Sequence, residues 1–454
     1  MPKIVLIGAG SVVFAKTLIT DILSFPSLQE GTLSLVDVNP ERLQLIAAYA
    51  RRLIEQQQLP VRLQVTTDRR EALQGAHFVI TVIQVGGVRA YELDMGIPAR
   101  YGIHQAVGDT IGPGGVFRGL RTLPVLLEVC RDMEALCPDA WLLNYSNPMA
   151  INCWGIYRAT RIRVVGLCHS VQNTAAYLAR VLGLHYRRLR YWAAGINHLA
   201  WFLRLECDGR DLYPRLRARM RQPAIEQADR VRVAVMRLFG YFVSESSYHL
   251  SEYLPYFRRT PELIAEYLPQ PKDYLGMYRN GLDEQRRSIE RQLAGEEALP
   301  LRRSREYASY VIDSLVSAQP RRFNLNVRND SLITNLPQGA CVEVPCMVDG
   351  TGIHPCHVGD LPGQCAALDR QSINVQELGV EAALTRNRKT VRQALAVDPL
   401  TSALLVPRQV RKMADEMLEA EKEWLADLHE RPLAARGRGR QALARALALE
   451  SKCR

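Results

Sequence analysis

Five short segments of this chain gather side chains that can bind a metal ion, move a proton or hold a small molecule. They are residues 108–115, 144–148, 166–170, 195–198 and 240–256. Four of the five lie just beyond a predicted strand or in a glycine-rich loop. In a doubly wound parallel sheet, ligands bind in the crevice at the carboxyl ends of the strands. The placement of these segments therefore favours a binding site for a small molecule.

Single residues within these segments also have ordinary structural roles. Asp109 could cap a turn, which from spacing alone is as common an outcome as catalysis. Asn147 precedes a proline, as turn residues often do, and Cys168 at a strand end is more often a small buried hydrophobe than a ligand. Cys168 and His198 lack the close spacing of a C-x-x-C metal motif, and Tyr253 could be a packed aromatic. The pattern alone leaves both interpretations open.

The first strand-to-helix turn carries a partial nucleotide-binding signature. Gly8, Gly10 and Ser11 follow a short β-branched run, where glycines let the backbone approach a pyrophosphate and a helix N-terminus stabilises its charge. Asp37 ends the second predicted strand, where a carboxylate can accept both hydroxyls of a ribose. Val13 replaces the usual third glycine. Together, Gly8, Gly10, Ser11 and Asp37 predict a dinucleotide site. The acidic Asp37 favours NAD over NADP.

The elements that must position these residues follow two patterns. Predicted strands at 3–7, 33–36, 61–65, 77–83, 140–143 and 163–167 alternate with predicted helices at 15–23, 41–57 and 150–157. This alternation predicts an α/β unit, a Rossmann-like doubly wound parallel sheet over residues 1–195. Later the alternation fades into a strand at 199–206 and helices near 224–238, 261–267, 282–294, 380–394 and 410–428. We expect a mixed α+β domain for substrate binding and oligomerisation over residues 196–430.

Composition narrows the class of protein further. The chain has 454 residues, 47% hydrophobic and 23% charged, which is ordinary for a globular protein. It contains no apolar run of about 18 residues, so we expect no membrane span. The first residues run straight into the glycine turn, too short an apolar stretch for a signal peptide, so we expect a cytoplasmic location. The ten cysteines are then expected to be thiols.

The net charge of +11 is concentrated at the C-terminus. Residues 431–454 contain seven Lys or Arg and one Glu, a net +6, which leaves only +5 for the rest of the chain. Such a basic tail is typically solvated and mobile. No aromatic residues lie between the arginines as stacking platforms, so nucleic acid is not an expected partner.

Taken together, these segments resemble glycoside hydrolase family 4, and within it the α-galactosidase branch. The resemblance runs from Ile4 to about Trp424 and excludes the basic tail. It rests on GAGS at 8–11, CHSVQ at 168–172 and GINH at 195–198, and on segments 109–115, 144–149, 240–253, 304–309, 326–330, 335–339 and 374–376. Agreement at so many ordered positions is improbable by chance.

The resemblance implies a hydrolase that uses NAD and Mn²⁺ on unphosphorylated α-galactosides such as melibiose. In this family NAD⁺ takes hydride from C3 of the sugar, a base removes the proton on C2, and the glycosidic oxygen leaves by elimination. Water then adds, and the hydride returns to the sugar. The matching positions imply that Cys168 and His198 hold the metal and that Asn147 contacts sugar hydroxyls near it. A thiolate ligand would make the enzyme need a reductant.

Proton transfer is also assigned through the resemblance. His169 follows the metal-binding cysteine and is the predicted acid for the leaving oxygen. Tyr253 is the predicted base, assisted by Asp109, because a tyrosine with its ordinary pKa near 10 needs such help. Tyr241, Tyr256 and Glu252 remain alternatives for the base.

Other functions stay open at this point. Within the family, an α-glucosidase or an α-galacturonidase would share these motifs. A NAD-dependent sugar or 2-hydroxyacid dehydrogenase would use the same nucleotide fold, but it would accumulate NADH and has no role for Cys168 and His198. A non-catalytic NAD sensor with a nucleic-acid-binding tail is the least favoured. The resemblance also implies a homodimer or homotetramer.

Overall fold

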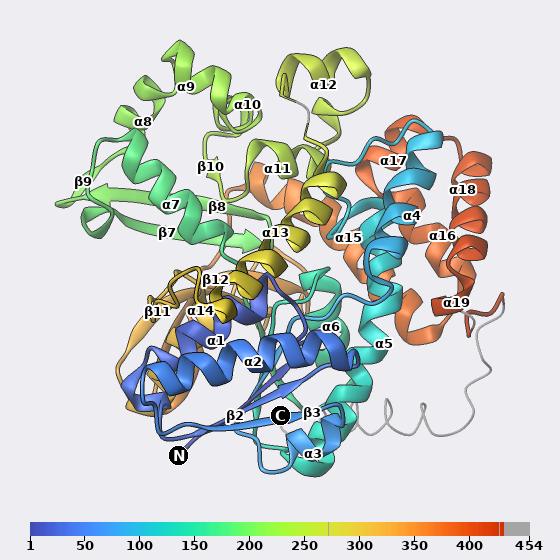
Figure 1. Cartoon of the computed structure of the whole chain (residues 1–454). Coiled ribbons are helices and arrows are strands. Elements are labelled where there is room, and N and C mark those ends of the chain that lie inside the picture. Colours follow the sequence, from blue (N-terminus) through green and yellow to red (C-terminus); the bar gives the residue numbers. More distant parts are fainter. Residues whose placement is uncertain (271, 426, 431–454) are drawn as a thin grey trace, which may run out of the picture.

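One mixed β-sheet contains strands from both halves of the chain, the first beginning at Lys3 and the last ending at Pro355 (Figure 1). The computed structural model describes residues 1–270, 272–425 and 427–430. Over these residues the strand order is β10-β8-β7-β12-β11-β6-β5-β4-β1-β2-β3, with β9 beside β8 and β13 beside β12. The predicted mobile tail at 431–454 lies outside the described residues.

The N-terminal half of the sheet is the predicted parallel unit. Its strands are β1 (Lys3–Ile7), β2 (Thr32–Val36), β3 (Arg62–Thr66), β4 (Phe78–Thr81), β5 (Trp141–Asn144) and β6 (Arg163–Gly166). Every neighbouring pair among them is parallel. β1, β2, β4, β5 and β6 are largely buried apolar runs, as expected for strands covered on both faces. The predicted Rossmann-like α/β fold is confirmed.

Seven helices connect and cover these strands. They are α1 (Phe14–Leu23), α2 (Pro40–Gln56), α3 (Arg69–Leu73), α4 (Gly87–Arg100), α5 (Gly112–Leu136), α6 (Met149–Ala159) and α7 (Ser170–Val181). The α2 helix begins at Pro40 as expected, because Asn39 caps it by accepting a hydrogen bond from the Arg42 amide at 2.9 Å. The α5 helix begins inside the glycine-rich segment 108–115, so Asp109 lies just before its N-terminus.

Antiparallel strands extend the same sheet beyond β6. They are β7 (Arg190–Ile196), β8 (Leu199–Cys207), β9 (Arg210–Asp211), β10 (Phe242–Val243), β11 (Arg321–Arg328), β12 (Cys341–Asp349) and β13 (Gly352–Pro355). The two halves join where Asn326 of β11 pairs with Gly166 of β6. The predicted domain boundary at 195/196 therefore falls within β7, and two separate domains remain a prediction.

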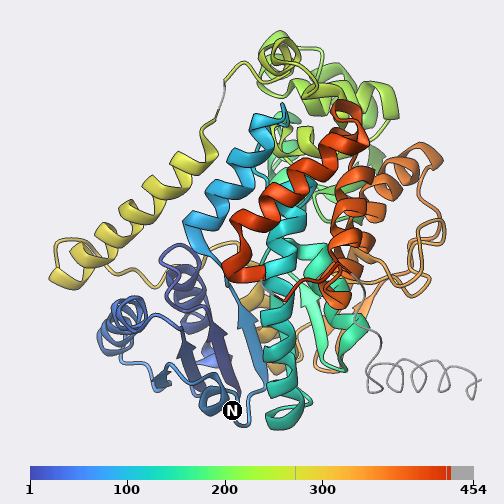
Figure 2. The same cartoon turned by 90° about the vertical axis from the view of Figure 1, so that its right-hand side faces the viewer.

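The remaining helices follow α7 in the chain. They are α8 (Tyr213–Arg219), α9 (Pro223–Ala228), α10 (Arg230–Phe239), α11 (Ser247–Tyr253), α12 (Pro261–Tyr267), α13 (Tyr274–Ala294), α14 (Tyr307–Ser317), α15 (Gly363–Thr385), α16 (Arg388–Val397), α17 (Pro399–Leu404), α18 (Pro407–Ala420) and α19 (Lys422–Leu425), with short 3₁₀ turns η1 (Pro26–Leu28), η2 (Tyr186–Arg188) and η3 (Pro255–Phe257). Several of them pack on the parallel half, such as α15 on α5 and α6 and α18 on α4. Figure 2 shows α4, α5 and α18 packed side by side. The predicted α+β character of the chain's second half is confirmed.

Three helix predictions were wrong in their bounds. The expected helix at 224–238 is two helices that meet at Asp229. The expected helix at 380–394 spans the break between α15 and α16, where Arg386 has a φ of 55°. The expected helix at 410–428 ends as α18 at Ala420, and α19 follows. In each case the apolar period continues across a turn that tertiary packing imposes.

Two global expectations can be compared with the structure. In the part of the chain that the structure describes, no helix combines the length and apolar character that a bilayer crossing requires. The nine described cysteines are free thiols, as expected.

Candidate active site

Asp109 lies in the loop that leads into α5. The side-chain amide of Asn147, which follows β5, donates a hydrogen bond to Asp109 Oδ2 at 2.8 Å. Asp109 Oδ1 is buried without a hydrogen-bond partner. Burial would raise the pKa of this carboxyl, but Arg118, His249 and His198 outweigh that effect and lower its pKa. Asp109 is therefore an ionised carboxylate with one oxygen free for a ligand.

Tyr253 and His249 approach the same loop from α11. The Tyr253 hydroxyl donates to Thr110 Oγ1 at 2.9 Å. His249 Nε2 lies 3.1 Å from the same Thr110 oxygen and 3.6 Å from Asp109 Oδ1. Burial, together with the charge of Asp109, raises the pKa of Tyr253 well above its ordinary value. The structure thus places Tyr253, the predicted base, in contact with Thr110. Thr110 follows Asp109, the predicted partner of Tyr253, in the chain.

His198 lies in the turn between β7 and β8, with a φ of 65°. Its Nε2 is 3.6 Å from Glu245 Oε2, and its ring is edge-on to that of His249 with centroids 4.5 Å apart. Among the described residues, His198, Glu245 and His249 form the one group whose ligand atoms lie within 4.8 Å of one another. His198 Nδ1 is buried and has no partner. Imidazole and carboxylate groups suit Mn²⁺, so this cluster fits a divalent cation.

Cys168 follows β6 and lies outside that group of three ligands. Its thiol donates to Ser170 Oγ at 3.4 Å. Burial, with a smaller contribution from Glu245, raises the pKa of the Cys168 thiol. A thiol must lose its proton to ligate a metal, so a bound cation would have to lower that pKa. Cys168 thus lies within electrostatic reach of Glu245, and its role as a metal ligand stays a prediction.

His169 is the residue just before α7, and 46% of its side chain is accessible. Its Nδ1 lies 3.1 Å from Glu306 Oε1. The hydrogen bond to Glu306 outweighs partial burial and raises the pKa of His169 to about 9. His169 is therefore protonated at neutral pH, as an acid for a leaving oxygen must be.

The glycine turn near β1 has the expected tight geometry. Gly8 has a φ of 90°, and a Cβ there would lie 2.8 Å from the Val82 carbonyl oxygen. Ser11 closes the turn by donating its amide to the Gly8 carbonyl. The Asp37 carboxylate accepts hydrogen bonds from the amides of Gly10 and Asn39, each at 2.8 Å. Asp37 thus braces the glycine turn, and its carboxylate oxygens keep further lone pairs for a ribose.

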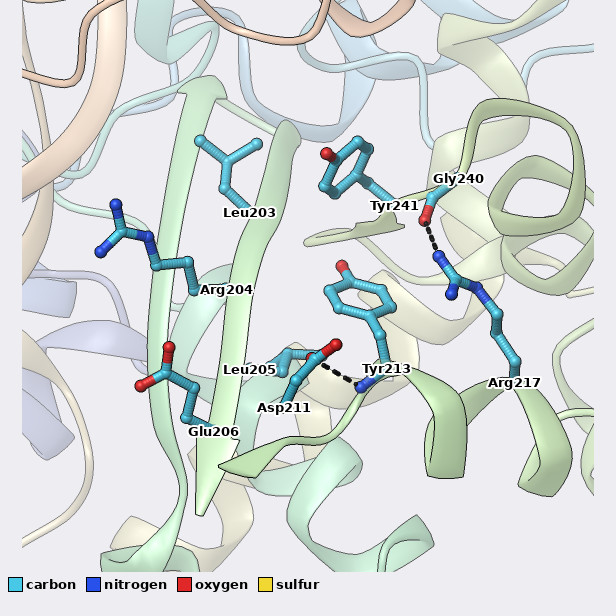
Figure 3. Close-up of a pocket in the computed structure, with 9 residues that line it drawn as sticks. All are labelled: Leu203, Arg204, Leu205, Glu206, Asp211, Tyr213, Arg217, Gly240 and Tyr241. Carbon is cyan, nitrogen blue, oxygen red and sulfur yellow. Dashed lines mark hydrogen bonds between the residues drawn. The ribbon is translucent and has the colours of Figure 1, made fainter. Parts of the chain in front are cut away.

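The structure separates the alternatives for the base. Tyr241 lines a cavity of about 420 Å³ between β8 and α8, where its ring meets that of Tyr213 at 5.9 Å (Figure 3). Tyr256 is 41% exposed in η3. Glu252 is buried beside His249 and binds backbone amides of the loop. Of the four candidates, Tyr253 and Glu252 reach the segment 106–110.

Sequence reasoning missed two members of the cluster, Glu245 and His249. Both stand in the segment 240–256, but neither was singled out. Their spacing of four residues was the available signal, because residues i and i+4 share a face where a helix begins. Glu343 of β12 was also missed. It is fully buried with both carboxylate oxygens unpartnered, and burial together with Cys168 raises its pKa well above the ordinary value.

Comparisons with known proteins decide the family. A model described as family 4 glycosyl hydrolase matches residues 3–184, and the model of that family's C-terminal domain matches residues 193–401. The chain belongs to glycosyl hydrolase family 4. The resemblance inferred from the sequence is therefore confirmed.

Within this family, the chain is similar to two α-galactosidases over nearly its whole length. It is 42% identical to that of Bacillus subtilis, covering 94% of this chain and 100% of the relative. It is 39% identical to that of Rhizobium meliloti, covering 93% and 89%. A solved 6-phospho-β-glucosidase of Thermotoga maritima, in a structure with manganese, NAD⁺ and glucose-6-phosphate, has the same fold, with 20% identity, coverage of 93% and 98%, and a TM-score of 0.79.

Proposed function

We propose that this family 4 enzyme is an α-galactosidase that hydrolyses unphosphorylated α-galactosides such as melibiose. The observation that carries the proposal is the full-length similarity to two α-galactosidases at 42% and 39% identity. A relative with a different specificity, the α-glucosidase of Erwinia rhapontici, is 31% identical.

The proposed cofactors are NAD and Mn²⁺. The turn at Gly8, Gly10 and Ser11, braced by Asp37, supports a dinucleotide site. His198, with Cys168 as predicted and Glu245 and His249 nearby, would hold the cation. When bound, NAD⁺ would oxidise the sugar reversibly at C3, and Mn²⁺ would stabilise negative charge on the sugar oxygens and on Tyr253.

The chain's own residues would move the protons. Tyr253 would have to be ionised first, and its phenolate oxygen, next to Thr110, would then accept the C2 proton. Asp109, with its free Oδ1, would bind a sugar hydroxyl or assist Tyr253. Asn147, which bonds to Asp109 Oδ2, would complete that contact with the sugar. His169, kept protonated by Glu306, would donate a proton to the departing glycosidic oxygen.

Two finer properties belong to the proposal. A cytoplasmic location is supported by the nine free thiols among the described cysteines and by the need for a reduced Cys168. Assembly as a homodimer or homotetramer is supported by the family resemblance, and light scattering after size-exclusion chromatography tests it. The expected partner is a small glycoside.

The test compares three aryl glycosides of equal leaving group, an α-galactoside, an α-glucoside and an α-galacturonide. Each is assayed with NAD⁺, Mn²⁺ and a reductant. The proposal predicts the highest kcat/KM on the α-galactoside and no net accumulation of NADH. A preference for either other glycoside would move the enzyme to another specificity of its family, and NADH accumulating with turnover would indicate a dehydrogenase.

A further inference from the structure

Glu252 makes an unusual set of contacts for a residue near the candidate base. A single carboxylate oxygen, Oε1, accepts hydrogen bonds from three consecutive backbone amides, those of Ala106, Val107 and Gly108 at 2.7, 3.0 and 2.8 Å. Glu252 itself is 4% exposed. A buried carboxylate bonded to several backbone amides fixes the local backbone, because each amide would otherwise be buried without a partner. Glu252 therefore holds the three residues that precede Asp109.

Tyr253, the next residue of α11, binds the other side of the same loop. Tyr253 donates to Thr110, the residue that follows Asp109. The loop is thus attached to α11 at 106–108 by Glu252 and at 110 by Tyr253, with Asp109 between the two attachments. Gly108 makes the sharp turn with a φ of 65°.

Burial raises the pKa of Glu252 to about 7, and the positive charge of Arg258 opposes that effect. Arg258 faces Glu252, and it is itself held by the Ser251 hydroxyl at 3.1 Å and by the His104 carbonyl at 2.6 Å. Glu252 Oε2 is 3.3 Å from His249 Nε2 and accepts no hydrogen bond. Oε1, bonded to three amides, thus holds the loop, while Oε2 remains unpartnered beside His249.

We propose that Glu252 is a positioning residue that folds the 106–108 backbone around its carboxylate and so aims Asp109 at the sugar. Glu252 and Tyr253 then fix the geometry between the base and its carboxylate partner, since neighbouring residues of one helix hold both flanks of Asp109. This inference rests on the proposed function, because it assigns Asp109 a role in sugar chemistry.

The experiment compares E252A and E252Q with the wild-type holoenzyme. Alanine removes the acceptor, and a loop displaced by about 1 Å costs on the order of 100-fold in kcat. Glutamine keeps an oxygen acceptor for the three amides, so we expect its kcat to fall by less than about tenfold. KM and NAD⁺ affinity should change little in either variant. E262Q, the same change on the exposed face of α12, is the control.

A double variant separates positioning from general destabilisation. If Glu252 acts through Asp109, adding E252A to D109N lowers kcat by less than about threefold beyond D109N alone. Effects that multiply would overturn the proposal, as would E252Q losing as much activity as E252A. If E252A does not fold, E252D, whose shorter side chain cannot reach all three amides, takes its place.

Amide hydrogen exchange gives a readout that does not depend on activity. The proposal predicts faster exchange at Ala106, Val107 and Gly108 in E252A, with no change in E262Q. Unchanged exchange at these amides would overturn it. A wild-type enzyme without turnover on any of the three glycosides would instead refute the proposed function, so the two failures are distinguishable.

Discussion

Two clusters of buried charged residues lie in this molecule, and they are built in opposite ways. In the first, Arg121 of α5 pairs with Asp94 of α4 and with Glu421 beyond α18, and all three side chains are at most 1% exposed. Arg121 Nη2 is 2.6 Å from Asp94 Oδ2. We call it the structural triad. Each of its charges meets an opposite charge at hydrogen-bond distance.

The second cluster, around the candidate active site, leaves its charges only loosely paired. His198 Nε2 lies 3.6 Å from Glu245 Oε2, and Asp109 Oδ1 lies 3.6 Å from His249 Nε2. Both distances are beyond that of a hydrogen bond. Asp109 Oδ1 and His198 Nδ1 are buried without partners. The structural triad also has two unpartnered buried atoms, Arg121 Nε and Glu421 Oε1, so the loose pairing of charges is what sets the second cluster apart. Charged groups buried without close partners cost folding free energy, so they persist where a ligand uses them. The structural triad should therefore govern stability, and the second cluster should govern activity.

The strongest test of the contrast between the two clusters is to change a side chain of the active-site cluster. We expect D109N and Y253F each to lower kcat/KM by roughly 1,000-fold, because acid–base and carboxylate contributions are of that size. The free energy of unfolding should fall by no more than about 1–2 kcal/mol, since D109N keeps an oxygen that can accept from Asn147 but loses the charge interactions that lower the pKa of Asp109. Steady-state kinetics and urea denaturation measure both effects. A D109N variant that is active but unstable would reverse the assignment.

Removing the shared charge of the structural triad should have the opposite result. R121M leaves the acidic side chains of Asp94 and Glu421 buried without their guanidinium partner, and we expect it to lower the free energy of unfolding by about 3–5 kcal/mol. R188M is the control, because Arg188 pairs with Asp208 on the surface. Its loss should cost less than about 1 kcal/mol. Urea denaturation of the two variants compares them, and equal losses would contradict the distinction between the clusters.

A bound cation should stabilise the folded protein only by binding to the second cluster. Manganese at 100 times its Kd is expected to stabilise the fold by about 2.7 kcal/mol, seen as a rise in Tm. H198A should abolish the rise, and H354A, which changes an exposed histidine on β13, should keep it. A rise that survives H198A would place the metal elsewhere.

The structural triad also predicts a gradual pH dependence of stability, the smallest of these effects when counted per pH unit. Burial and the nearby charge of Asp94 raise the pKa of Glu421 to about 9. A raised folded-state pKa gives stability that is complete below the unfolded value and is lost as pH rises through about 9. The free energy of unfolding should fall from pH 6 to pH 9, relative to E421Q, by up to about 1 kcal/mol per pH unit. Parallel curves for the two proteins would show that Glu421 is already ionised.

The sequence predicted the strands of the parallel half well, because local signals determine them, but it did not predict helices α3, α4, α5 and α7. β-Branched runs such as residues 3–7 and the capped start of α2 at Pro40 depend on neighbours in the chain. The junction between the halves could not be predicted, since Asn326 and Gly166 pair across 160 residues of sequence. The helix breaks near Asp229 and Arg386 likewise depend on packing.

The candidate site divides in the same way. Asp109, Asn147, Cys168 and His198 could be chosen from motifs because each follows a strand or a glycine-rich turn. Glu245 and His249 could not, since their meeting with His198 depends on how α11 packs against the β7–β8 turn. The second role of Asp37, as a brace for Gly10, also required three-dimensional structure.

The most direct test of the central claim is the fate of deuterium at C2 of an aryl α-galactoside. The wild-type enzyme is incubated with this substrate, NAD⁺, Mn²⁺ and a reductant in ordinary water, beside Y253F. We expect galactose that has lost deuterium to solvent or a slowed turnover, no net NADH, and turnover by Y253F that is roughly 1,000-fold slower. Full retention of deuterium at an unchanged rate, or equal activity of Y253F, would contradict it.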